Sequence, residues 1–228
     1  MKTNIKPAAA KTRKRILIMD DHPITRQGLS QLLSREADLV VCGEVDNAEQ
    51  AFAAIKSRRP DLILTDLTLP GKSGLDFIRE MKALHPGVKT MVLSMHDEGI
   101  YAERALRAGA GGYVMKSESG EKLLRAIRQV LAGEICVSEK VSGALLNHLA
   151  GHRSDRNATA LSMLTGREFE VFQLIGQGLS TQQIGERLHI SGKTVETHRA
   201  HLKEKFNLKS GVEFTAYAIR WAVANQLV

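Results

Sequence analysis

Strand-like and helix-like segments alternate along the first half of this 228-residue chain, and this alternation restricts the fold more than any other feature. Runs rich in branched apolar residues are separated by stretches in which apolar residues recur every three to four positions. Such an order is typical of a doubly wound parallel sheet with helices on both faces. The expected strands are residues 15–20, 39–44, 62–66, 89–94 and 112–115, and the expected helices are 23–35, 48–58, 74–84, 100–108 and 121–131.

The pattern changes beyond residue 160, where helix-start signals replace the strand pattern. A Ser or Thr followed three residues later by Glu or Gln can cap a helix by bonding its free backbone amides. The helix starts of this region predict a small all-α domain of four short helices. They are Thr165 with Glu168, Ser180 with Gln183, Ser191 without an acidic partner, and Ser210 with Glu213.

These patterns divide the chain into a basic tail (1–14), an α/β domain (15–133), a linker that includes one further helical pattern (134–160), and the all-α domain (161–228). The formal charge is +7, but the residues before Ile16, which are the tail and Arg15, include six basic residues and no acidic one. Global charge is therefore a weak argument for a nucleic-acid partner. The tail is expected to be a solvated arm, with contacts to a phosphate backbone as the alternative.

No apolar run approaches the roughly 20 residues that a membrane-spanning helix needs. The basic N-terminus also lacks the apolar segment of a secretory signal. The two cysteines, Cys42 and Cys136, have no metal-binding spacing. We therefore expect a cytoplasmic protein with free thiols and no contact with a membrane.

Charged side chains stand at the ends of three expected strands: Asp20 and Asp21 at the first, Asp66 at the third and Lys116 at the fifth. Because the carboxyl ends of parallel strands meet at one edge of a sheet, we expect these side chains to form one pocket. Crowded carboxylates repel one another unless a hard cation joins them, and Mg²⁺ prefers such oxygen ligands. With the hydroxyl of Ser94, the pocket has the groups that phosphoryl transfer needs.

This arrangement resembles the receiver domain of two-component response regulators over residues 15–131. The resemblance is carried by Asp20-Asp21, by the D-x-x-x-P-x-x-x-G pattern from Asp66 to Gly74, by Ser94, and by the segment that ends in Lys116. It implies a five-stranded, flavodoxin-like α/β fold with Mg²⁺ as cofactor. The implied roles are Asp66 as phosphoacceptor; Asp20, Asp21, Asp66 and the Thr68 carbonyl as metal ligands; Ser94 and Lys116 as ligands of the phosphoryl group; and Ser94 with Tyr113 as the switch.

Each of these residues also has a plainer interpretation. An Asp-Asp pair before Pro23 can cap a helix, a lysine at a strand end can be a surface group, and Tyr113 can be a static packing residue. Their joint occurrence in the order of the family favours the pocket. A phosphatase with an aspartyl-phosphate intermediate is the enzymatic alternative, but it needs a second acid two residues after the nucleophile, where this chain has Thr68.

In the all-α domain, a short helix from residue 181 joins through a tight turn to a longer helix over 193–206, which is the order of a helix-turn-helix. The residues from Leu164 to His198 resemble the LuxR-type DNA-binding domain, and the whole chain is therefore similar to NarL/FixJ response regulators. It departs from the family pattern at Gly185, where alanine is usual, and at Phe206, where leucine is common.

The outward stripe of the second helix carries the residues expected to contact DNA, with Glu196, Thr197 and Ala200 at base-reading positions. Glu196 could instead pair with Arg199 and carry no base information. The last helix, 212–225, is a dimer contact by family resemblance or a part of the small core, and both interpretations stay open. The full set of DNA-contacting candidates is Lys193, Thr194, Glu196, Thr197, Arg199, Ala200, Lys203 and Lys205, of which the basic residues are candidates for phosphate contacts.

The resemblance implies a transcription regulator that a sensor histidine kinase phosphorylates at Asp66, and that then forms a homodimer and binds double-stranded DNA. It implies no enzymatic activity beyond acceptance of the phosphoryl group and at most its slow loss. The alternative is a regulator controlled by its level or by a protein partner, without phosphorylation. An RNA-binding antiterminator is disfavoured by the helix-turn-helix pattern and by the lack of aromatic stacking residues on the strands.

Overall fold

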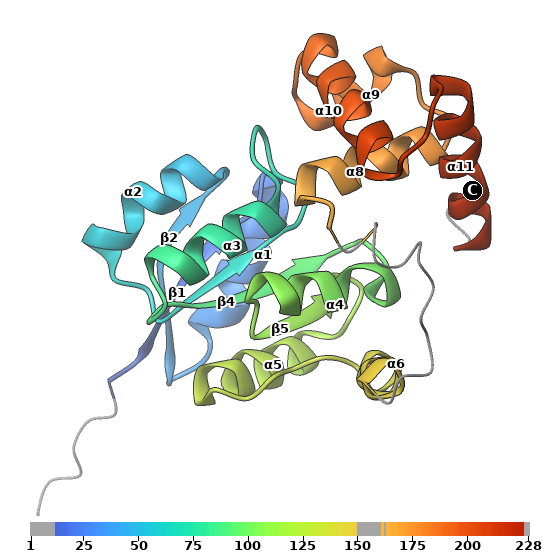
Figure 1. Ribbon diagram of the computed structural model, residues 1–228. Helices are drawn as coiled ribbons and strands as arrows, with labels where there is room; N and C mark the ends of the chain where they lie inside the picture. Colours follow the sequence, from blue (N-terminus) through green and yellow to red (C-terminus); the bar gives the residue numbers. More distant parts are fainter. Residues whose placement is uncertain (1–11, 150–160, 162, 226–228) are drawn as a thin grey trace, which may run out of the picture.

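The computed structural model describes residues 12–149, 161 and 163–225, and an α/β domain comes first along the chain (Figure 1). Its strands pair in parallel, with the two strands that precede Asp20 and Asp66 adjacent at the centre of the sheet. The strands are β1 (Lys14–Met19), β2 (Leu39–Val45), β3 (Leu62–Thr65), β4 (Lys89–Ser94) and β5 (Gly112–Met115), in the spatial order β2-β1-β3-β4-β5.

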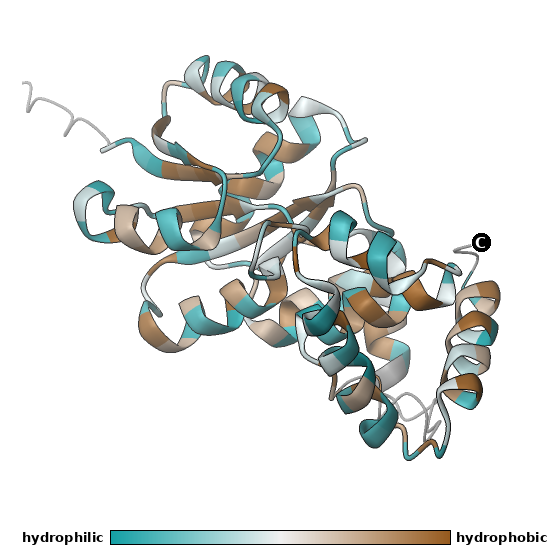
Figure 2. Cartoon of the chain, turned by 90° about the horizontal axis from the view of Figure 1, so that it is seen from above, coloured by the Kyte–Doolittle hydropathy of each residue, from teal (hydrophilic) through white to brown (hydrophobic). Residues whose placement is uncertain are grey.

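Helices cover both faces of this sheet (Figure 1). Alternate side chains of a strand point to opposite faces, so Leu17 and Met19 of β1 join one core while Ile16 and Ile18 join the other. Figure 2 shows the strands largely as a hydrophobic layer between helices of mixed character. One face carries α1 (Pro23–Ser34) and α5 (Gly120–Ala132), and the other carries α2 (Ala48–Arg58), α3 (Gly74–Leu84) and α4 (Glu98–Ala108).

A further helix, α6 (Glu139–Leu149), packs on α4. The helical domain then consists of α8 (Gly166–Gly176), α9 (Thr181–Leu188), α10 (Gly192–Lys205) and α11 (Gly211–Ala224). The predicted fold class, a five-stranded parallel α/β domain followed by a four-helix helix-turn-helix domain, is confirmed. No helix in the described part of the chain is both long enough and apolar enough to cross a membrane. The tail up to residue 11 and linker residues 150–160 lie outside the described residues.

Caps fix the starts of the helices in the helical domain. Thr165 and Ser180 each form a complete capping box with the residue three positions on. The third box is incomplete: Ser210 caps the Glu213 amide, but the Glu213 carboxylate accepts from the Lys209 amide instead of the Ser210 amide. Ser210 has φ −130°, against −64° and −71° at the two complete boxes, so a different amide faces the carboxylate.

Two glycines shape this domain. Gly178 follows α8 with φ +82°, a left-handed conformation that glycine adopts without strain, as the sequence predicts. At Gly185 in α9, an added Cβ would lie 2.8 Å from the Ile190 carbonyl oxygen, which is too close for an alanine without movement of the turn. The departure from the family pattern at Gly185 therefore permits a tighter approach of the helix-turn-helix turn to α9.

Candidate phosphorylation pocket and DNA-contacting surface

Asp66 and Lys116 meet at the carboxyl edge of the sheet, directly after β3 and β5. The Lys116 Nζ atom lies 2.6 Å from Asp66 Oδ2 and 2.7 Å from Asp20 Oδ2. Burial alone would lower the pKa of Lys116, but the charges and hydrogen bonds of Asp66 and Asp20 outweigh it, and the pKa is raised. The lysine therefore stays charged and holds two buried carboxylates together.

The acidic cluster extends to the loop between β1 and α1. Ligand atoms of Asp20, Asp21, His22 and Asp66 all lie within 4.8 Å of one another. His22 Nδ1 is 2.6 Å from Asp21 Oδ1 and 3.1 Å from Asp20 Oδ1, so the imidazole reaches the same carboxylates. Three carboxylates in so small a volume form an oxygen-rich donor set that suits a hard divalent cation such as Mg²⁺.

Ser94 and Tyr113 lie on neighbouring strands beside the acidic cluster. Ser94 is completely buried at the end of β4, and its carbonyl oxygen accepts a hydrogen bond of 2.8 Å from the Lys116 amide. Tyr113 is 2% exposed and donates its hydroxyl to the His96 carbonyl oxygen at 2.8 Å. Burial raises the pKa of Tyr113 well above its usual range, so it stays a neutral donor. The ring thus points inward in this structure.

His96 connects the pocket to α4, a role that the sequence did not reveal beyond its position two residues after Ser94. Its Nε2 atom lies 2.8 Å from the Thr68 hydroxyl, and its ring centroid lies 4.8 Å from that of Tyr101. Burial lowers the pKa of His96, which keeps the imidazole neutral near pH 7. Thr68, the predicted carbonyl ligand of the metal, therefore touches a side chain that packs on α4.

The first helix of the helical domain, α8, docks on the α/β domain beside this pocket. Asp76 of α3 accepts hydrogen bonds from the Gly166 and Arg167 amides, at 3.0 and 3.2 Å. These amides lie in the first turn of α8 and have no acceptor within the helix. Arg167 also donates to the Gly71 carbonyl oxygen at 2.6 Å, in the loop that follows Asp66. The α/β domain thus caps a helix of its neighbour.

A second group of contacts lies further along α8. The Tyr101 hydroxyl of α4 donates to Gln173 Oε1, and both residues are at most 5% exposed. The Arg104 guanidinium lies 3.6 Å from the centroid of the Phe169 ring, which is a favourable cation–π interaction. We call the whole set of docking residues the α8 clasp: Gly71, Asp76, Tyr101 and Arg104 of the α/β domain with Gly166, Arg167, Phe169 and Gln173 of α8.

A buried ion pair joins Arg167 of the clasp to Glu170 of the same helix at 2.6 Å. Burial raises the pKa of Glu170 to about 7, although Arg167 opposes this shift by its charge and hydrogen bond. The other groups that act on this carboxylate are Ser73 and Asp76 beside α3, and its charge in turn acts on Tyr101 of α4. An ionisable group that titrates near neutrality thus lies between the two domains.

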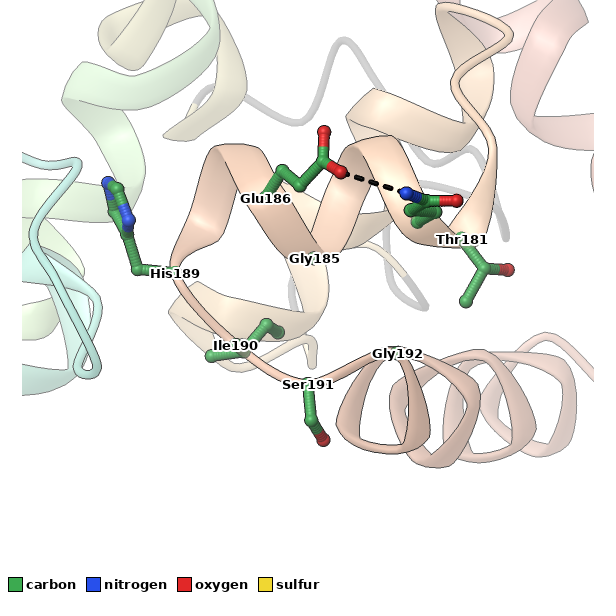
Figure 3. A pocket seen from close by; sticks show the side chains of 8 residues that line it. Thr181, Gly185, Glu186, His189, Ile190, Ser191 and Gly192 are labelled. Carbon is green, nitrogen blue, oxygen red and sulfur yellow. Dashed lines mark hydrogen bonds between the residues drawn. The ribbon is translucent and has the colours of Figure 1, made fainter.

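A cavity of about 910 Å³ separates the acidic cluster from the helical domain. Asp66, Ser94 and Lys116 line one side of it, and Glu170, Arg187 and His189 line the other. Figure 3 shows His189 at the end of α9, directed away from Ser191 and Gly192. The carboxylate of Asp66 therefore lines a cavity that residues of α8 and α9 also line.

The outward face of α10 is free in this arrangement. Val195 and Leu202 are buried and hold the helix on the domain, while Lys193, Glu196 and Thr197 are exposed. Thr194 and Ala200 are exposed too, and Arg199 is half-buried with its Nε atom 3.8 Å from Glu196 Oε1. The stripe expected to enter DNA is thus exposed in the described arrangement of the two domains.

The two remaining lysine candidates differ from one another. Lys205 bonds Glu168 at 2.6 Å and the Met163 carbonyl oxygen at 3.4 Å, so its charge ties α10 to the start of α8. Lys203 is half-buried in the same turn. The structure therefore brings Lys193, Thr194, Glu196, Thr197 and Ala200 together on one exposed face, with Arg199 at its side, and engages Lys205 elsewhere.

Two family models match the chain: the response regulator receiver domain over residues 16–128, and bacterial regulatory proteins of the luxR family over residues 162–218. The chain is 39% identical over 200 residues to the nitrate/nitrite response regulator protein NarL of Escherichia coli K12, covering 87% of this chain and 91% of that protein. It is 34% identical over 210 residues to the oxygen regulatory protein NreC of Staphylococcus haemolyticus, covering 90% and 97%.

Solved structures give the same picture of the fold. RcsB from Salmonella enterica serovar Typhimurium, bound to promoter rprA in the presence of phosphomimetic BeF3⁻, matches with a TM-score of 0.60 and 24% identity, covering 91% of this chain and 98% of that one. A two-component response regulator of the LuxR family from Aurantimonas matches with a TM-score of 0.56 and 32% identity, covering 61% of this chain and 99% of that one.

Proposed function

Because this chain belongs to the NarL/FixJ transcriptional response regulators, with a receiver domain followed by a LuxR-type DNA-binding domain, we propose that phosphorylation of Asp66 by a sensor histidine kinase switches it. The observation that carries the proposal is the Lys116 ammonium, 2.6 Å from Asp66 within the acidic cluster. A carboxylate oxygen of Asp66 attacks the phosphorus of a phosphohistidine, the phosphorus–nitrogen bond breaks, and the imidazole leaves with a proton.

The roles of the neighbouring residues follow from their chemistry. Asp20, Asp21, Asp66 and the Thr68 carbonyl would hold Mg²⁺, which would neutralise charge on the phosphoryl oxygens. Lys116 and the Ser94 hydroxyl then bind two of these oxygens. The Lys116 ammonium has three donor hydrogens and two present contacts, with Asp20 and Asp66, so it can also donate to a phosphoryl oxygen. Lys116 thus links its present partners to the phosphoryl group, and Asp66 accepts that group without turning over a substrate.

The α8 clasp connects this event to the DNA-binding domain. Gly71, whose carbonyl oxygen accepts a hydrogen bond from Arg167, lies in the loop that begins at Asp66. In the same loop, Thr68 contacts His96, whose ring packs on Tyr101 of the clasp. Movement of Ser94 and Tyr113 toward the phosphoryl group would disturb the His96 segment that both of them bond. We infer that phosphorylation weakens the clasp and frees the helical domain.

The output is binding of a homodimer to double-stranded DNA in the cytoplasm, with α10 in the major groove. The exposed face of α10 supports this, as does the RcsB structure bound to a promoter. On α11, Val212, Ile219 and Val223 are exposed apolar residues on the side away from the core, and they are available for pairing with a second copy.

One observation favours a second candidate function. The groove-facing stripe of α10 is exposed while α8 is docked on the α/β domain, and nothing in the described residues covers it. A regulator controlled by its level or by a protein partner would need no phosphorylation to bind DNA. The experiment below separates the two candidates.

The test compares the wild-type protein with Asp66→Asn, treated with acetyl phosphate with and without Mg²⁺. Asp61→Asn is the matched control, because Asp61 precedes the opposite end of β3 and bonds Lys14 there. Intact mass, sedimentation and affinity for selected duplexes are measured. We expect a Mg²⁺-dependent adduct in wild type and Asp61→Asn only, with tighter dimerisation and DNA binding. An adduct on Asp66→Asn would refute Asp66 as the phosphoacceptor. No adduct on wild type, or an adduct without effect on dimerisation or DNA binding, would favour the second candidate.

A further inference from the structure

Glu196 is held in one position at the front of α10. The Thr181 hydroxyl, at the start of α9, donates to Glu196 Oε1 at 2.6 Å. Thr181 lies across the hollow between the two helices from the first residues of α10 (Figure 3), and an added Cβ on Gly192 would touch its methyl group at 3.8 Å. The side chain of Glu196 is nevertheless 60% exposed. One carboxylate oxygen is thus anchored to α9, while the other is free to accept from outside.

The surroundings favour a negative charge at this point. The carboxylate is bonded by the first residue of α9, where the helix dipole is positive. Arg199, one turn further along α10, brings a guanidinium to 3.8 Å. Both effects offset the repulsion that a carboxylate meets near DNA phosphates.

Thr197 and Ala200 present methyl groups beside this carboxylate. The Thr197 hydroxyl donates back to the Lys193 carbonyl oxygen at 3.1 Å, so its polar atom is already bonded within the helix. Ala200 has only a methyl group, and both residues are exposed. The reading face thus offers one hydrogen-bond acceptor and two methyl groups.

We propose that Glu196, positioned by Thr181, selects cytosine by accepting from its exocyclic amino group, and that Thr197 and Ala200 contact thymine methyl groups. This rests on the proposed function, in which α10 enters the major groove. There, guanine presents two acceptors and thymine an acceptor beside its methyl, so both repel a carboxylate. Adenine places an acceptor next to its amino group, which suits an amide better. Cytosine alone presents a donor with no competing acceptor.

The test is selection of duplexes from a randomised pool by the full-length chain in the presence of acetyl phosphate and Mg²⁺. Wild type, Glu196→Gln and Thr181→Val are compared, with Glu204→Gln as the control that removes an exposed charge further along α10. We expect one position in each half-site where wild type prefers cytosine on the order of tenfold to a hundredfold. Glu196→Gln should change that preference to adenine, Thr181→Val should weaken it, and Glu204→Gln should leave it intact.

Three outcomes would overturn the inference: no position with a cytosine preference, a preference that Glu196→Gln leaves unchanged, or a uniform gain of affinity in both glutamine variants. In each of these cases wild type still selects a defined sequence. Failure of the proposed function looks different, because wild type then enriches no sequence at all. The two failures are therefore distinguishable in one experiment.

Discussion

Replacing Tyr101 by phenylalanine should weaken the α8 clasp while leaving the aromatic packing in place. The ring lies 4.8 Å from that of His96 and 5.3 Å from that of Phe169, and phenylalanine keeps both contacts. Only the hydroxyl that donates to Gln173 is lost. In the docked state Gln173, 5% exposed, then loses its donor, whereas in the released state it faces water.

The expected magnitude follows from the surroundings of Gln173. Leaving a buried acceptor without its donor costs about 1–3 kcal/mol. Gln173 lines the cavity between the domains, where water can reach its side chain, so the lower part of that range applies. A cost of about 1.4 kcal/mol raises the ratio of released to docked molecules about tenfold.

Hydrogen exchange at the Gly166 and Arg167 amides measures this ratio at a distance from the substitution. Both amides belong to the first turn of α8 and are bonded across the interface by Asp76. Their protection therefore reports on docking, and in Tyr101→Phe both should exchange about tenfold faster. Dimerisation and DNA binding without a phosphodonor should rise in parallel.

Tyr217→Phe is the matched control, because it makes the same chemical change in α11, where the ring packs on Phe172 and Phe206 within the helical domain. Unchanged exchange at the two amides of Tyr101→Phe, or an equal acceleration in Tyr217→Phe, would refute the view that the Tyr101 hydroxyl secures the docked state.

Three further predictions concern pH, the lysine and the DNA site. The pKa of Glu170 is raised to about 7 by burial in the docked state, so docking binds a proton and is favoured as pH falls. From pH 8 to pH 6 the protection factors of the α8 amides, which are corrected for the intrinsic pH dependence of amide exchange, should rise about tenfold, and Glu170→Gln should abolish this rise. Lys116→Ala leaves Asp20 and Asp66 buried without their ammonium partner, so the free energy of unfolding measured in urea should fall by about 3 kcal/mol, and added Mg²⁺ should restore it. Lys122→Ala removes an exposed ion pair and should show neither the loss nor the recovery. Phosphorylation should tighten binding to a duplex with two half-sites much more than to one with a single half-site, and equal gains in titrations of the two duplexes would contradict control through pairing.

The fold and the phosphorylation pocket could be predicted because each depends on local pattern and on strand order. Asp66 and Lys116 are separated by 50 positions in sequence, yet both follow buried strands, and parallel strands bring their ends to one edge. The same logic places Ser94 beside them. The observed side-chain contacts agree with the expectation from strand ends, while the roles of these residues in phosphoryl transfer stay predictions.

The α8 clasp could not be predicted, because docking of two domains leaves no periodic signal in the sequence. Asp76 and Arg167 are residue types that usually face water, and only the approach of α8 to α3 makes one a helix cap and buries the other. Lys205 shows the converse: it has the charge expected of a phosphate contact, but its bond to Glu168 depends on how α10 meets α8.

The arrangement of the two domains restricts how phosphorylation can act. The groove-facing stripe of α10 is exposed in the docked state, and so are Val212 and Val223 of α11, at 82% and 59%. Since docking covers neither surface, it cannot inhibit by blocking them within one molecule. What docking does fix is the orientation of the helical domain relative to its receiver. Two copies must place their α10 helices one DNA turn apart, and a rigid clasp permits this only if the receivers pair in one matching geometry. Release of the clasp removes that restriction, so each helical domain can take the orientation that its half-site requires, and the second half-site is bound at high effective concentration.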